Sequence, residues 1–185
     1  VNDLAPELQA QWSRLDFDAR KYLGEIGQTR AAGEASHNIL EQMWARPTCD
    51  VNGIWGGYTG PGSKTVIPSK AHAKVSFRLV NCQNPEKVQA GFREFVRQRL
   101  PAGFQVEFHS HGASPALQLP LSSPYLQKAR AALKAEWDKD PVLKGSGGSI
   151  PIVGSFKRDL DMDSLLIGFG LDDDRIHSPN EKYDL

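Results

Sequence analysis

The sequence predicts an α+β fold, in which helices cover one face of an antiparallel sheet. Three observations indicate this class. Apolar and polar residues alternate through residues 71–80, which is the period of a strand with one buried face. Residues 85–100 then carry apolar side chains at helical spacing, and residues 104–108 alternate again. The order strand, helix, strand favours a small layer of helices against a sheet.

The first third of the chain is expected to be helical. Asp3 is a suitable cap for a helix that carries Leu8, Trp12 and Leu15 at near-helical spacing. Two further short helical segments are expected at residues 19–23 and 39–44. Residues 51–62, which are rich in Gly, Thr and Pro, then indicate a strand followed by turns.

The later elements begin with recognisable cap residues. Asn84 and Pro85 are favoured at the cap and at the first position of a helix. Residues 115–124 indicate a linker, which places a domain boundary near residue 120. A further helix is expected to begin at the Ser-Pro pair that closes this linker. Residues 165–167 are expected to form a short buried strand.

Composition excludes several functional classes. Of the 185 residues, 39% are hydrophobic and 24% are charged, which is normal for a globular protein. Lys+Arg and Asp+Glu are both 22, so neither a nucleic acid nor an anionic membrane is an expected partner. No signal peptide is visible, and a cytoplasmic location is expected. Cys49 and Cys82 are expected to be buried free thiols, with a single disulfide left open.

Glycines precede one expected helix. Gly147, Gly148 and Ser149 stand before Pro151, so Ser149 can cap a helix that has Pro151 in its first turn. Free backbone N–H groups at such a start favour a carboxylate or another anion. The alternative is an ordinary capped helix after a glycine turn.

His177 is the candidate metal ligand. It lies in a loop beyond the expected buried strand, and Glu181 or Asn180 is placed to orient it. The alternative is a surface-loop histidine, because a metal site needs three or four ligands. His109 and His111 would share one face of a strand, where a weak metal site and two solvated histidines are the alternatives.

Six stretches, taken in order, resemble one family. They are WARPT (44–48), VNGI (51–54), GSKTVIP (62–68), VSFRLV (75–80), GGSIP (147–151) and HSPNE (177–181). The series is similar to the dinuclear zinc metallopeptidases that include carnosinase, bacterial dipeptidases, aminoacylase, acetylornithine deacetylase and glutamate carboxypeptidase. Each motif alone is weak, but the ordered set covers nearly the whole chain.

The resemblance implies a catalytic α/β domain that is interrupted by a lid, or dimerisation, domain. The lid has a four-stranded antiparallel sheet with two helices on one face. The chain then divides into a helical lead-in (1–45), the lid (46–120) and an incomplete C-terminal part of the catalytic domain (121–185). Because lids of two subunits commonly pair, the resemblance also implies a homodimer.

The resemblance further implies hydrolysis of a dipeptide or N-acyl amino acid by a water held between two zinc ions. His177 matches the final histidine ligand of one zinc, and Glu181 is expected to support it. Gly148 and Ser149 match the loop that receives the substrate carboxylate. Asn52 stands where carnosinase-type members often have a histidine that reaches across the dimer to the substrate carbonyl, and its amide N–H can donate there.

The family's His-x-Asp, bridging Asp and Glu-Glu pair lie upstream of the lid and are absent here. The general base is expected in the same upstream part. Val1 in place of an initiator methionine also indicates a piece of a longer chain. The chain is therefore expected to be inactive alone and to mediate dimerisation and carboxylate binding. A non-catalytic dimerisation or binding module with the same lid fold is the alternative.

Overall fold

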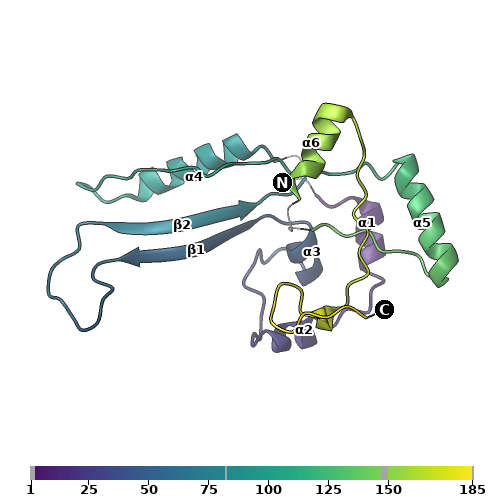
Figure 1. Cartoon of the computed structure of the whole chain (residues 1–185), viewed down its shortest axis with the longest axis horizontal. Coiled ribbons are helices and arrows are strands. Elements are labelled where there is room, and N and C mark those ends of the chain that lie inside the picture. The colour runs from purple at the N-terminus through teal and green to yellow at the C-terminus, as the bar shows by residue number, and fades with distance from the viewer. Residues whose placement is uncertain (1–2, 82, 147–149, 185) are drawn as a thin grey trace.

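The molecule has an elongated arm and a separate group of helices (Figure 1). The computed structural model describes residues 3–81, 83–146 and 150–184. The elements in chain order are α1 (Pro6–Trp12), α2 (Ala19–Glu25), α3 (Ile39–Trp44), β1 (Thr48–Gly56), β2 (Ala71–Arg78), α4 (Pro85–Arg99), α5 (Pro124–Trp137), α6 (Pro151–Leu160) and the 3₁₀ turn η1 (Asp172–Asp174). We call β1, β2 and α4 the arm, and the other helices the helical end.

The short helices of the first third form as predicted, but α1 begins later and ends earlier than expected. Ala5, not Asp3, occupies its N-cap position, and the helix ends at Trp12 before Leu15. Pro6 explains the start, because proline is favoured at the first helical position and fixes the residue before it as the cap.

β1 and β2 pair as an antiparallel hairpin with one irregularity. Val51 lies opposite Val75, whereas Gly53 lies opposite Lys74, so Asn52 has no partner in the ladder. Asn52 is therefore the extra residue of a β-bulge, a feature that bends a strand and re-aims a side chain. Its side chain is exposed.

α4 lies along the hairpin (Figure 1). Phe77 of β2 meets Phe92 of α4 edge to face, with 5.3 Å between the ring centroids. The predicted start of this helix is confirmed, since the Asn84 side chain accepts the N–H of Lys87 at 2.7 Å and Pro85 takes the first position.

The described residues form a two-stranded sheet, and two predicted strands are absent from it. Residues 104–108 form no strand, and Phe108 instead lies against the guanidinium of Arg93, 5.7 Å from its ring centroid. Residues 165–167 form no strand either, and Leu166 is 63% exposed rather than buried. A strand needs a hydrogen-bonded neighbour, and nothing in the described part of the chain pairs with these segments.

The helical end is held together by few buried side chains. Within the described ranges, the buried apolar residues are Trp12, Leu40 and Val153. The Trp12 indole N–H donates to the carbonyl of Leu143 at 2.7 Å, and its ring meets that of Trp44 at 5.2 Å. The lead-in helices therefore pack against the segment that follows α5.

The exposed surface is large for the mass of the chain. Its solvent-accessible area is 14979 Å², whereas a compact monomer of this mass exposes about 8,800 Å². Large apolar side chains are exposed at the start of α6, along it and in the segment after it. Exposed apolar side chains there are Ile150, Ile152, Phe156, Leu160, Met162, Leu166, Ile167, Phe169, Leu171 and Ile176.

Gly145 lies so close to Trp44 that an added Cβ would clash with the Trp44 carbonyl oxygen. We expect Gly145→Ala to lower the free energy of unfolding by about 1–3 kcal/mol, because backbone must move to admit the methyl group. Gly91→Ala in α4 is the matched control. Its Cβ would meet nothing, and loss of a helical glycine should raise stability by about 0.5–1 kcal/mol. Urea unfolding of the full-length protein measures both, and equal effects would contradict the role of Gly145.

Candidate functional site

His177 lies in the turn that follows η1, within a segment that we call the histidine loop (residues 171–182). Its φ is 65°, and that of Arg175 is 55°, both in the left-handed region that residues other than glycine rarely adopt. The N–H of Ser178 donates to the carbonyl of Arg175 at 2.8 Å, and the N–H of His177 donates to the Glu181 carboxylate at 3.4 Å. Glu181 therefore contacts the backbone of His177.

Asp174 is a residue of this loop that sequence reasoning missed. It is 2% exposed, and its carboxylate accepts the N–H of Leu171 at 2.7 Å. Its own carbonyl accepts the N–H of Lys182 at 3.0 Å. Three consecutive aspartates ordinarily indicate a solvated surface, so nothing in the local sequence distinguishes the buried one.

Asn52 lies in a different part of the molecule from His177. Figure 1 shows β1 in the arm and η1 at the helical end. Close to the bulge, Trp55 stacks on His72 with 5.0 Å between the ring centroids, and the Lys74 ammonium lies 5.7 Å from the Trp55 ring. One chain therefore does not bring the two candidate residues to a common site.

Gly148 and Ser149 lie outside the described residues. α6 begins at Pro151, so Ile150 occupies the N-cap position, and the prediction that Ser149 is the cap is wrong. The reason is again the preference of proline for the first helical position. The isoleucine side chain offers no oxygen, so Ile150 makes no side-chain cap at the start of α6.

Asp163 joins the start of α5 to the residues after α6. Its carboxylate accepts the Ser123 hydroxyl at 3.0 Å, and the Lys157 ammonium lies 3.0 Å from its other oxygen. The Lys157 ammonium and then the Ser123 hydroxyl lower the pKa of Asp163 below its ordinary 3.8. The Asp161 and Asp163 carboxylates raise the pKa of Lys157 above 10.5. Asp163 and Lys157 therefore both stay charged at neutral pH, and the ion pair between them is retained there.

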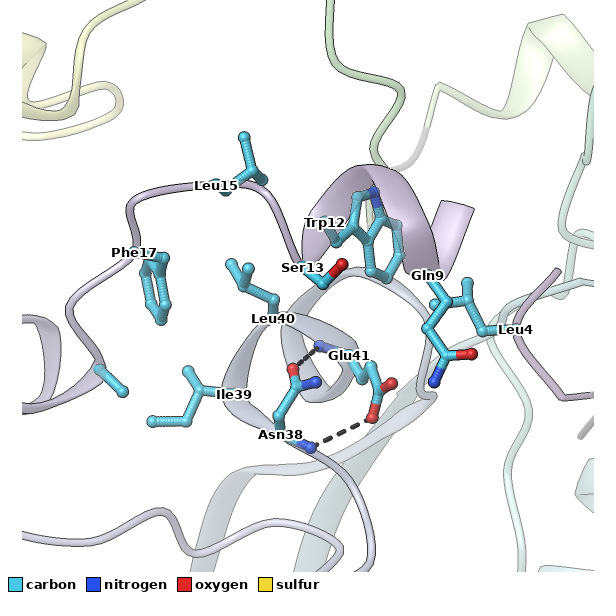
Figure 2. A pocket seen from close by; sticks show the side chains of 11 residues that line it. Leu4, Gln9, Trp12, Ser13, Leu15, Phe17, Asn38, Ile39, Leu40 and Glu41 are labelled. Carbon is cyan, nitrogen blue, oxygen red and sulfur yellow. Dashed lines mark hydrogen bonds between the residues drawn. The ribbon is translucent and has the colours of Figure 1, made fainter. Parts of the chain in front are cut away.

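A pocket of about 340 Å³ lies beside α1 and α3 (Figure 2). Leu15, Phe17 and Ile39 are among its apolar lining residues. Its one ionisable lining residue within the described chain, Glu41, accepts the backbone N–H of Asn38 at 3.1 Å, as part of the capping box of α3. The pocket therefore offers no free group for acid–base chemistry.

The described part of the chain does not contain a complete metal site. No group of three or more His, Cys, Asp and Glu within it is placed to hold a metal ion. The His177 imidazole is of a type that binds zinc in proteins. Cys49 is free but exposed, contrary to its expected burial, and Cys82 lies outside the described residues.

No helix in the described residues is long and apolar enough to cross a bilayer.

Comparison with known proteins decides the family, because the peptidase dimerisation domain model of the M20 peptidases matches residues 4–103. The chain belongs to the M20 peptidase family. The resemblance inferred from the six ordered motifs is thereby confirmed.

The M20 relatives are dipeptidases by name. The chain is 32% identical over 182 residues to the Cys-Gly metallodipeptidase of Candida albicans, covering 94% of this chain and 36% of that protein. It is 28% identical over 186 residues to the Beta-Ala-His dipeptidase of Rattus norvegicus, covering 97% and 37%. The chain thus spans little more than a third of the length of these M20 relatives.

A solved M20 structure has the same fold. The M20 family metallo-carboxypeptidase of Sulfolobus solfataricus superimposes with a TM-score of 0.79 at 30% identity, over 98% of this chain and 41% of that chain. The likeness covers both the arm and the helical end.

Proposed function

We propose that this chain is part of a dinuclear zinc metallopeptidase that hydrolyses a dipeptide or an N-acyl amino acid. The observation that carries the proposal is the match to the M20 family, together with His177 in a loop where its backbone N–H donates to the Glu181 carboxylate. The relatives are named metallodipeptidases and dipeptidases, which supports peptide hydrolysis. When bound, zinc supplies Lewis-acid activation of water and of the amide carbonyl.

His177 would supply one imidazole ligand, and Glu181 would hold the backbone that carries it. Their geometry supports these roles, because the N–H of His177 donates to the Glu181 carboxylate. Gly148 and Ser149 would receive the substrate carboxylate before α6, whose N-cap residue Ile150 makes no side-chain cap. The remaining ligands and the general base would come from residues outside this chain, so the chain alone would not turn over substrate.

Asn52 would act on the substrate of the partner subunit in a homodimer. Its exposure on the arm and its separation from η1 support a role away from the metal ligand of its own chain (Figure 1). An amide N–H that points from a bulge can stabilise a developing oxyanion. The arm, as part of a lid at residues 46–120 with a four-stranded sheet, would carry the dimer contact.

The lead-in (1–45) and residues 121–185 would belong to the catalytic side of the protein. Their mutual packing supports this division, since Trp12 bonds to Leu143 and Arg130 of α5 pairs with Glu7 of α1 at 3.4 Å. The lid would then be an insertion between them.

The test is made on the full-length protein. We expect two zinc ions per subunit, hydrolysis of a dipeptide with a free C-terminal carboxylate, and slower hydrolysis of the same dipeptide amide. Chelation should remove the activity and added zinc should restore it. A full-length dimer that binds no zinc and cleaves neither peptide would instead favour a non-catalytic dimerisation or binding module.

A further inference from the structure

The histidine loop is closed at its base by one residue. Asp174 accepts the N–H of Leu171 through its carboxylate and the N–H of Lys182 through its carbonyl, at 2.7 and 3.0 Å. These two partners are the first and last residues of the loop. His177 lies between the two bonded ends, so the separation of those ends limits where the turn can lie.

Among the described residues, Lys182 is the cation that lies beside the buried Asp174 carboxylate. Oδ1 of Asp174 is buried and accepts no hydrogen bond, and the Lys182 ammonium lies 3.5 Å away. A buried carboxylate without a nearby cation is strongly unfavourable. Lys182 also contacts Asp184 and Asp173, whose carboxylates raise its pKa, so the ammonium stays charged. Two contacts therefore join Asp174 to Lys182, one between their backbones and one between their charged side chains, in addition to the bond from Leu171.

The loop is also tightly folded over Gly170. A Cβ at Gly170 would lie 3.3 Å from Ile176 and 3.5 Å from the Asp174 carboxylate. Asn180 has a φ of 62°, like the left-handed residues described above. Such backbone conformations persist only when surrounding contacts enforce them. The Asp174 contacts are the ones that bridge the loop from end to end.

We propose that Asp174, together with Lys182, is a positioning residue that fixes the turn carrying His177. The inference rests on the proposed role of His177 as a zinc ligand. Asp174 acts on the backbone on either side of the turn rather than on the imidazole. Its removal therefore widens the range of imidazole positions and weakens the binding of zinc, without removing a ligand.

The chain supplies a matched control in the neighbouring aspartate. Asp173 carries the same charge and its carboxylate also lies 3.2 Å from Lys182, but its side chain is 74% exposed. Asp174→Ala removes the side-chain bond to Leu171 and the buried charge. Asp174→Asn keeps an oxygen for the Leu171 N–H and removes only the charge. Asp173→Asn makes the same charge change outside the base of the loop.

The experiment measures, on the full-length protein, the zinc dissociation constant by chelator competition and amide hydrogen exchange through residues 175–182. Asp174→Ala is expected to weaken binding of the zinc ion proposed for His177 by about tenfold or more, and to speed amide hydrogen exchange in the histidine loop. Asp174→Asn should fall between this variant and the unsubstituted protein, and Asp173→Asn should stay within about twofold.

Unchanged zinc affinity and exchange in Asp174→Ala would overturn the proposal, as would equal effects from Asp173→Asn. If Asp174→Ala does not fold, Asp174→Asn decides between the same outcomes. His177→Ala is measured in parallel. Unaltered zinc binding in that variant would refute the proposed ligand, whereas normal loop exchange in the Asp174 variants would refute the positioning role alone.

Discussion

Replacing His177 with alanine in the full-length protein is expected to reduce kcat/KM by about a thousandfold or more and to lower the zinc content from two ions per subunit toward one. The imidazole is the zinc ligand that we propose for this chain, and removal of a ligand lowers zinc affinity and the Lewis-acid activation that zinc supplies. A loss of about 4 kcal/mol in transition-state stabilisation corresponds to this change in rate. Zinc analysis and dipeptide hydrolysis on the same sample measure it.

His109→Ala is the control for that substitution. The side chain of His109 is 79% exposed and lies in the segment after α4, where its described neighbour is the exposed Glu107. Its replacement should leave both zinc content and turnover unchanged. Full zinc occupancy with normal turnover in His177→Ala would show that the histidine loop has no part in the metal site.

The isolated 185-residue chain is expected to lack a cooperative unfolding transition, to bind a hydrophobic dye strongly and to hydrolyse no dipeptide. Its accessible surface exceeds that of a compact monomer of the same mass by about 6,000 Å². With so few buried apolar side chains, the helical end cannot offset the conformational entropy of ordering the chain. Calorimetry, dye binding and a hydrolysis assay on the purified chain test this expectation.

Amide hydrogen exchange on the isolated chain is expected to differ between the hairpin and the C-terminal part. Amides of β1 and β2 should be better protected than those of residues 150–184, because the hairpin ladder lies within the chain. A sharp unfolding transition with uniform protection would mean that the exposed apolar side chains of α6 are not a surface that requires covering. The full-length protein provides the comparison.

The elements that sequence reasoning found are those whose partners are local. The helix after Asn84 has its own cap and proline, and the strand at residues 71–78 has its partner across one turn. Residues 104–108 and 165–167 carry strand-like patterns, but a strand also needs a neighbour that a local pattern cannot supply. The cap of α6 was expected at Ser149, because serine is a favoured cap residue. The N-cap is Ile150, since Pro151 takes the first helical position.

The candidate residues and the contact of Glu181 with His177 were expected from the motifs, whereas the burial of Asp174 and the bulge at Asn52 were not. A histidine in an HSPNE loop and an asparagine in VNGI were identified from the motifs. The burial of Asp174 beside the exposed Asp173 depends on how the loop closes over Gly170, which composition does not encode. The bulge at Asn52 depends on a register shift against β2, which becomes visible only when the two strands are paired.

Because Asn52 is the extra residue of the bulge, its side chain has little part in the folding of the arm. Asn52 has no Cα partner across the ladder and its side chain is exposed, so a replacement there disturbs no paired cross-strand residue. Substitutions at residue 52 should therefore be nearly free of cost to the arm, whether the new side chain is an amide or an imidazole. Under the proposed role of Asn52 at the substrate, natural variation at this point would change which substrates are accepted while the arm keeps its fold.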